Sequence, residues 1–304
     1  IPLRLVGSEM CIRDRYCCAN KKGSENMTKV TLMGAGGKMG VRLATNLMES
    51  DHDVSHVEID PVGKKRLKDE TGIDCVNQNQ ALSEAEAVIL AVPDRLIGKV
   101  LSGFVNELSS GTAVIMLDAA APHAETLPNR DDITYFVAHP CHPPLFNDET
   151  APDAKKDYFG GIAAKQHIIC ALAQGPEEHY AMCEKIARDF YRPVMRSHRC
   201  TVEQMALLEP ALSESVGATF AKVLKDATDE AARRGVPYQA AEDFLLGHLT
   251  ILLAVAFGVQ PGGKLSDGCM LAISEAEPVI FRDGWLDQIF APEAVKASVK
   301  SICE

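Results

Sequence analysis

Two histidines in the run His139-Pro-Cys-His142-Pro-Pro can move a proton or bind a metal ion. His139 follows an apolar stretch and precedes a proline, so it is stiffly mounted. An imidazole pKa of about 6.5 suits proton transfer at neutral pH. Three roles stay open for His139: a general acid or base, which we favour, a metal ligand together with His142, or a structural hydrogen bond. For His142 a structural role is at least as well supported.

Carboxylates form a second group, where the sequence after Thr201 predicts a helix. Glu203 and Glu214 fall near one helical face, and Glu203 is expected to face a cleft, although a glutamate at a helix start can simply complement the macrodipole. Pro210 should kink the helix, which either aims Glu209 into the pocket or only shapes the packing. The candidate catalytic residues are His139, Glu203 and Glu209. If a divalent metal is bound, its candidate ligands are His139, His142 and Glu203.

A glycine-rich turn near the start of the chain, VTLMGAGGKMG, has the composition of a phosphate cradle. Its first glycine permits a tight turn, the middle pair leaves the backbone open to a diphosphate, and Gly40 lets the next helix pack closely. The pattern predicts a bound dinucleotide. The candidate cofactor-binding residues of the turn are Gly34, Ala35, Gly36, Gly37, Lys38 and Met39.

The next strand-like run ends in Glu58, which stands where an acid would bind the adenosine ribose hydroxyls. A carboxylate there repels the 2′-phosphate of NADP and favours NAD. Lys64, Lys65 and Arg66 follow at once and could tolerate a phosphate, so NADP stays an alternative, and Glu58 could instead be a solvated strand end.

The elements that must position these residues alternate between apolar runs and amphipathic segments. This alternation predicts an α/β fold of the Rossmann type, a doubly wound parallel sheet with helices on both faces. Runs such as AVILAV read as buried parallel strands. Because ligands lie outside the carboxyl ends of such strands, Val92, Pro93 and Asp94 are expected to line the cofactor. The short run Asp118–Pro122 is expected to lie against the substrate or the cofactor amide.

The chain is expected to divide in three. Residues 1–26 lack a helical period and a signal core and look like a disordered, non-native extension, with Met27 as the natural start. Residues 27–200 should form the NAD-binding Rossmann domain. Residues 201–304 should form an all-helical substrate and dimerisation domain, because their apolar faces are too broad for one copy to cover.

Composition excludes several classes of function. A net charge of −11 disfavours nucleic acid and anionic membranes. Ten scattered cysteines without C-x-x-C pairs read as reduced thiols of a cytoplasmic protein. The most apolar stretch, residues 245–257, is shorter than a membrane span requires, so we expect a buried or interface helix and no membrane association.

Blocks along the whole chain from Met27 resemble the D-apionate oxidoisomerase family, notably MGAGGKMGVRLATNL, YFVAHPCHPPLFNDET, DYFGG, QGPEE and TVEQMALLEPALSESVGAT. More broadly the chain resembles the 6-phosphogluconate and β-hydroxyacid dehydrogenase superfamily. The His-Pro after a late strand also resembles that of prephenate dehydrogenases. Glu203-Gln204 resembles the metal-binding helix of ketol-acid reductoisomerases, but Arg199 stands where that pattern has an additional Asp.

The resemblance implies an enzyme that oxidises a branched sugar acid with NAD and rearranges its carbon skeleton by an acyloin-type shift. D-Apionate would become 3-oxo-isoapionate, with His139 as the base. The homodimer expected from the broad apolar faces is a separate inference, which does not depend on the resemblance. A metal requirement stays open, because Arg199 or a protonated histidine could replace the cation. A plain β-hydroxyacid dehydrogenase without the shift is the alternative.

Overall fold

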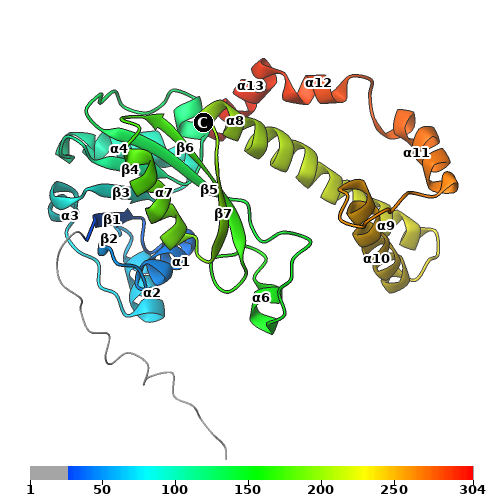
Figure 1. The fold of residues 1–304 in the computed structure, drawn as a ribbon, viewed down its shortest axis with the longest axis horizontal. Helices are drawn as coiled ribbons and strands as arrows, with labels where there is room; N and C mark the ends of the chain where they lie inside the picture. The colour runs from blue at the N-terminus through cyan, green and yellow to red at the C-terminus, as the bar shows by residue number, and fades with distance from the viewer. Residues whose placement is uncertain (1–26, 304) are drawn as a thin grey trace, which may run out of the picture.

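The computed structural model describes residues 27–303, and they form one seven-stranded sheet followed by a helical segment (Figure 1). The expected extension at residues 1–26 lies outside the described residues. The strands are β1 Lys29–Met33, β2 Asp53–Val57, β3 Ala87–Leu90, β4 Ala113–Met116, β5 Thr134–Pro140, β6 Gln166–Gln174 and β7 Val194–Arg199. The helices of this part are α1 Lys38–Leu47, α2 Pro61–Thr71, α3 Gln78–Glu84, α4 Ile97–Phe104, α5 Ala120–His123, α6 Pro152–Lys156 and α7 His179–Phe190, with short 3-10 turns η2 Asp94–Leu96 and η3 Val105–Glu107.

The strand order is β2-β1-β3-β4-β5-β6-β7. Chain direction across the sheet changes between β1 and β3, and ligands bind at such switch points in doubly wound sheets. The predicted Rossmann-type fold is confirmed. Two strands depart from the expected parallel sheet, because β6 runs antiparallel to β5 and β7 runs parallel to β6. The link between β5 and β6 contains only the short α6, so the chain turns back along the same edge instead of crossing over a face.

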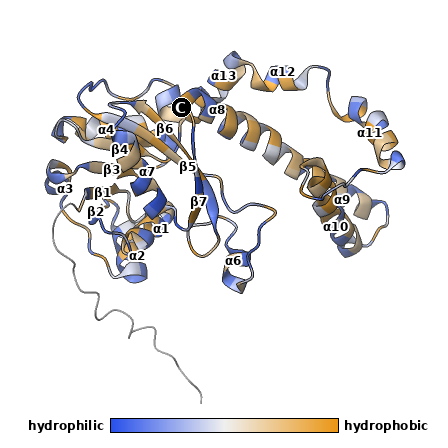
Figure 2. Cartoon of the chain, viewed as in Figure 1, coloured by the Kyte–Doolittle hydropathy of each residue, from blue (hydrophilic) through white to orange (hydrophobic). Residues whose placement is uncertain are grey.

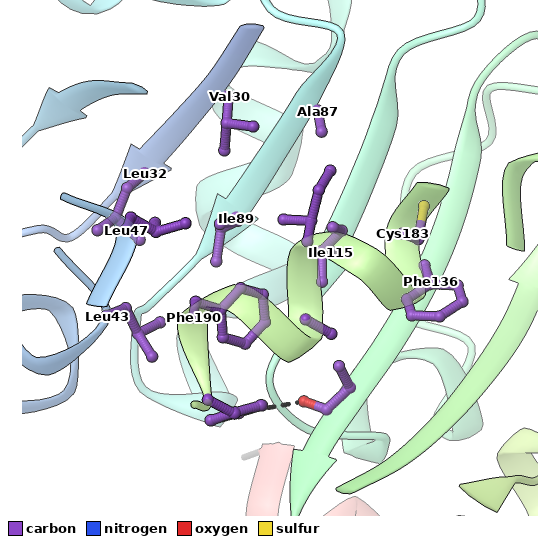
Figure 3. Close-up of a cluster of buried hydrophobic side chains, with 14 of the residues drawn as sticks. Val30, Leu32, Leu43, Leu47, Ala87, Ile89, Ile115, Phe136, Cys183 and Phe190 are labelled. Atoms are coloured by element: carbon purple, nitrogen blue, oxygen red, sulfur yellow. Dashed lines mark hydrogen bonds between the residues drawn. The ribbon is translucent and has the colours of Figure 1, made fainter. Parts of the chain in front are cut away.

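Alternate residues of the central strands feed two apolar layers, one on each face of the sheet. Ile89 and Ile115 point into the layer covered by α1 and α7, where Figure 3 shows Phe190 packing over them. Val88 and Val114 point into the opposite layer, covered by α3 and α4. All four side chains are fully buried. Such strands are apolar on both faces, as the continuous runs in the sequence predicted.

Every element after β7 is helical, as expected. The elements are α8 Val202–Ala206, the π-helix η4 Leu207–Ala218, α9 Thr219–Arg233, α10 Tyr238–Ala256, α11 Asp267–Ile280, α12 Trp285–Phe290 and α13 Pro292–Cys303. The chain leaves the sheet along η4 and α9 and returns through α11 and α12 to α13 (Figure 1). There α13 packs on α5 and η4, around the small buried residues Ala120, Ala206 and Ala211. This contact ties the helical segment to the edge of the sheet that carries the site.

The helix α10 corrects one expectation. Its apolar stretch belongs to a helix of 19 residues, long and apolar enough to cross a membrane by length and composition alone. Ala254 is the one buried residue of α10, so the expectation of a buried helix is wrong for the single chain. Figure 2 shows hydrophobic residues along this projecting segment as well as in the sheet. The expectation of an interface helix stays a prediction.

Candidate active site

The glycine-rich turn joins β1 to α1 with very close backbone contacts. Gly34 has a φ of +74°, and a Cβ there would lie 2.4 Å from the carbonyl oxygen of Ala91, which directly follows the neighbouring strand β3. A Cβ on Gly40 would lie 2.0 Å from the Gly34 carbonyl oxygen. Both positions therefore require glycine, and the close packing predicted for Gly40 is found. The turn brings the N-terminus of α1, with its free N–H groups, to the switch point of the sheet.

Gly36 is a glycine for a reason that the sequence did not reveal. A Cβ there would lie 2.3 Å from the backbone of Gly63 at the start of α2. The backbone N–H of Gly36 donates to Glu58 Oε2 at 3.0 Å, and Arg66 donates to the Gly36 carbonyl oxygen at 2.7 Å. Glu58 Oε1 also accepts from the backbone N–H groups of residues 59 and 60. The acid predicted to bind ribose is thus fixed against the turn, and Arg66 is engaged in the same network.

Beside this turn lies a cleft of about 500 Å³, between the carboxyl ends of the strands and the helical segment. Nine of the predicted site residues line it: Gly37, Lys38, Met39, Val92, Pro93, Asp94, His139, His142 and Glu209. Gly34, Ala35, Gly36 and Glu58 lie outside its lining and shape the turn. The cleft therefore brings the predicted cofactor turn and the predicted base into one space.

The cleft is also lined by residues that the sequence reasoning missed. Phe159 and Tyr191 come from the segments flanking β6 and α7, and Val299 and Ile302 come from α13. The spacing of three between Val299 and Ile302, in an amphipathic run, was a signal that these two share a face. No pattern in the sequence placed that face against the cleft.

His139 stands at the end of β5 with both ring nitrogens engaged. Nδ1 donates to the Leu117 carbonyl oxygen at 2.8 Å, since a carbonyl only accepts. Nε2 lies 3.3 Å from Glu209 Oε2, and Asp118 Oδ2 lies 3.7 Å from Nδ1. Burial alone would lower the pKa of His139, but the hydrogen bond and charge of Glu209, aided by Asp118, outweigh it and raise the pKa. The same contact with His139 lowers the pKa of Glu209.

Two further carboxylates flank this pair. Burial, with the charge of Asp118 beside it, raises the pKa of Asp94 to about 6. Burial also raises the pKa of Asp118, although its Oδ1 accepts from the backbone N–H of Ala120 at 2.6 Å. The cleft therefore gathers several titratable groups with shifted pKa values, which is typical of a site for acid–base chemistry.

Glu209 reaches the cleft because its helix changes type. Thr201 and Gln204 form a reciprocal cap at the start of α8, with hydrogen bonds of 3.2 and 3.0 Å. The chain then continues as the π-helix η4 with Pro210 inside it. Proline removes one N–H and clashes with the preceding turn of an α-helix, and the wider turns of η4 accommodate it. Of the two outcomes foreseen at Pro210, the structure shows Glu209 aimed into the cleft.

Glu203 does not lie where we expected. It lines a different cavity, together with His123 and Lys296, and does not face His139. It sits in the first turn of α8, whereas Met205 of the same helix and Glu209 of η4 line the cleft. Nδ1 of His142 donates to the Phe159 carbonyl oxygen at 2.9 Å. Among residues 27–303, no group of three or more His, Cys, Asp or Glu side chains could hold a metal ion. His139, His142 and Glu203 therefore do not form the candidate metal site.

Comparison with known proteins agrees with this architecture. Residues 29–122 match the family model for coenzyme F420-dependent NADP oxidoreductases, and residues 147–303 match that for the C-terminal part of decarboxylating phosphogluconate dehydrogenases. A D-apionate oxidoisomerase of Cupriavidus necator is 56% identical over 274 residues, covering 90% of this chain and 99% of that protein. The chain belongs to the D-apionate oxidoisomerase family.

Other relatives extend the match. A D-apionate oxidoisomerase of Blautia hydrogenotrophica is 40% identical over 259 residues, covering 84% of this chain and 90% of that protein. A crystal structure described as a semialdehyde dehydrogenase NAD-binding protein from Cupriavidus necator, in complex with calcium and NAD, superimposes with a TM-score of 0.89 at 55% identity, covering 91% of this chain and 100% of that one. An NADH-preferring ketol-acid reductoisomerase shares the fold at a TM-score of 0.62 and 14% identity, covering 90% of this chain and 85% of that one. The family assignment thus covers the sheet and the helical segment together.

Proposed function

We propose that this protein is an NAD-dependent oxidoisomerase that converts D-apionate to 3-oxo-isoapionate. The observation that carries the proposal is His139, held between Leu117 and Glu209 in the cleft beside the glycine turn. The family relatives named D-apionate oxidoisomerase and the NAD in the 55% identical structure support the substrate and the cofactor. The glycine turn and Glu58 fit a dinucleotide by their own geometry.

In the first step, the C2 carbinol of the substrate is oxidised. NAD, when bound, accepts the C2 hydrogen with its electron pair. Only Nε2 of His139 can take the hydroxyl proton, because Nδ1 already carries a proton that it donates to Leu117. Glu209 then faces an imidazolium at 3.3 Å and stabilises its charge. Such a positioned base typically contributes about 10²–10⁴-fold to the rate.

In the second step, the carbon skeleton rearranges without further oxidation. The tertiary hydroxyl next to the new ketone loses its proton, and a hydroxymethyl group migrates with its bonding pair to the ketone carbon. The former ketone oxygen becomes a hydroxyl group. His139 now carries the proton that it took from this same oxygen, so it can return it there. The donor geometry around the cleft does not fit a metal centre, and we derive no step through one.

We infer a preference for NAD over NADP from Glu58. Its carboxylate lies against the turn at Gly36, where it would oppose a 2′-phosphate. Of the basic residues that could have favoured NADP, Lys65 pairs with Asp69 and Arg66 binds the turn carbonyl. NADP is thus expected to bind more weakly.

We further propose that residues 27–200 act as the cofactor domain, that residues 201–304 act as the substrate and dimerisation domain, and that the protein is a cytoplasmic homodimer. Exposed apolar side chains on α10 and at its C-terminal end support self-association. Among them are Phe244, Leu246 and Phe257, which are 68%, 59% and 77% exposed. The seven cysteines of residues 27–303 are all free, as in a reducing compartment. The net charge of −11 disfavours nucleic acid and anionic membranes as partners.

The decisive experiment is to incubate the purified protein with D-apionate and NAD, following NADH by absorbance and the product by ¹³C NMR. Substrate deuterated at C2 should yield deuterated NADH, and the product should be the rearranged 3-oxo acid. NADH with only the unrearranged 2-oxo acid would identify a plain β-hydroxyacid dehydrogenase. No NADH at all would contradict the proposal.

A further inference from the structure

The rearrangement needs a proton acceptor that the His139–Glu209 pair does not supply. His139 serves the C2 oxygen in both steps of the proposed reaction, first taking its proton and later returning it. The proton of the tertiary hydroxyl leaves from a different oxygen, on the neighbouring carbon. A second basic group must therefore face the substrate in the same cleft.

Four carboxylates line the cleft. Three of them are bonded to another group or belong to the residues that follow the strand ends. Glu209 is paired with His139, which lowers its pKa and makes it a weaker base than a free glutamate. Asp118 accepts from the backbone of Ala120 and lies 3.7 Å from His139 Nδ1. Asp94 sits beside Asp118 in the strand-end group predicted to line the cofactor. The remaining carboxylate is Glu214.

Glu214 lies on η4, five residues after Glu209, and lines the cleft with it. In an α-helix, residues five apart diverge by about 140° around the axis, so the two carboxylates would point in different directions. The hydrogen bonds of a π-helix join residues five apart, which stacks such residues one turn above the other. In this segment the π-helical geometry explains why both carboxylates reach one space.

Glu214 is also available to react. The described residues 27–303 give it no hydrogen bond or ion pair, and its side chain is exposed enough to exchange a proton with solvent. Partial burial and the nearby charges of Glu209 and Asp118 raise its pKa, so it holds a proton more strongly than Glu209 does.

We propose that Glu214 is the catalytic base of the isomerisation step, taking the proton of the tertiary hydroxyl while His139 handles the C2 oxygen. This assignment rests on the proposed oxidoisomerase function. The tertiary C–O bond becomes the new carbonyl as its carbon loses the hydroxymethyl group. The proton on Glu214 passes to solvent, and the one on His139 returns to the C2 oxygen. No oxidant or reductant beyond the first step is needed.

The test compares Glu214→Gln with wild type and with the matched exposed variant Glu107→Gln, which lies outside the cleft in η3. One assay measures NADH formed in a single turnover. A second reduces the quenched mixture with borodeuteride and counts rearranged and unrearranged skeletons by NMR. We expect Glu214→Gln to form NADH within about threefold of wild type while rearranged product falls by about 10²–10⁴-fold. Glu214→Asp should recover part of the loss, and Glu107→Gln should behave as wild type.

Two results would overturn the assignment. Rearranged product at the wild-type rate in Glu214→Gln would show that another group takes the proton. Equal losses of NADH and rearranged product would show that Glu214 acts in binding or structure, and NAD titration with thermal melting would then separate those two. Failure of the proposed function itself is recognised separately, because wild type would then form no NADH from D-apionate.

Discussion

Gly40 is the position where a single methyl group should uncouple the cofactor turn from its helix. It lies inside α1, where alanine is intrinsically favoured over glycine by about 1 kcal/mol. A Cβ there would lie 2.0 Å from the Gly34 carbonyl oxygen and 2.9 Å from the Cα of Ala35. Both neighbours are backbone atoms and cannot swing aside. Ordinary contact begins at 3.4 Å, so the turn and α1 must separate by roughly 1.4 Å.

That separation has two measurable consequences. Overpacking of this kind costs about 1–3 kcal/mol of folding free energy, which exceeds the gain in helix propensity. The N-terminus of α1 also moves away from the diphosphate that it would bind, so the Kd for NAD should rise at least about tenfold, or ~1.4 kcal/mol. Urea unfolding and calorimetric titration with NAD measure the two effects on Gly40→Ala.

Gly103→Ala is the matched control. Gly103 also lies inside a helix, α4, and a Cβ there meets nothing within 4 Å. This variant should be as stable as wild type or slightly more stable, and it should bind NAD normally. If Gly40→Ala matched Gly103→Ala in both stability and NAD affinity, the close packing of turn and helix would not be what holds the cofactor site.

Three further predictions test the site and its assembly. Glu209→Gln removes the charge that raises the pKa of His139. The acid limb of the pH profile of kcat/KM requires a neutral His139, so it should shift to lower pH. A limb that does not move would mean that the titrating group is not His139. Glu58→Gln should narrow the preference for NAD over NADP by about tenfold or more in paired KM measurements, whereas an unchanged ratio would remove Glu58 from the ribose site. Phe244→Lys should convert a dimer to a monomer in light scattering. Val76→Lys, on the sheet domain, is the control and should leave the dimer intact. A wild-type protein that is already monomeric would refute the interface.

The fold was readable from the sequence because both of its main signals are local. Buried parallel strands are continuous apolar runs, and AVIL and AVIM became β3 and β4 with every residue buried. The turn after β1 needs a glycine for its positive φ at Gly34 and two more where backbones approach closely, at Gly36 and Gly40. Each of these local requirements is visible in the sequence as a glycine. Local patterns could not give the direction of β6, because the run HIICALAQ is equally suited to either orientation. Its direction follows from the long link after β5, which contains no crossover helix.

The misplacement of Glu203 shows where helical periodicity fails. Glu203 and Glu214 are eleven residues apart. An α-helix turns by about 100° per residue, so these two side chains fall within roughly 20° of each other around the axis, whereas Glu209 falls on another face. The sequence argument therefore grouped Glu203 with Glu214. In the structure the helix is α-type only to Ala206 and π-type from Leu207, so the angular count changes after the first turn. Glu203 is left facing the cavity of His123, while Glu209 and Glu214 share the cleft with His139. Pro210 was the one local sign of this change, because a proline inside a helix interrupts the α-helical hydrogen bonding. Whether the chain answers with a kink or with a π-helix decides which way every later carboxylate points.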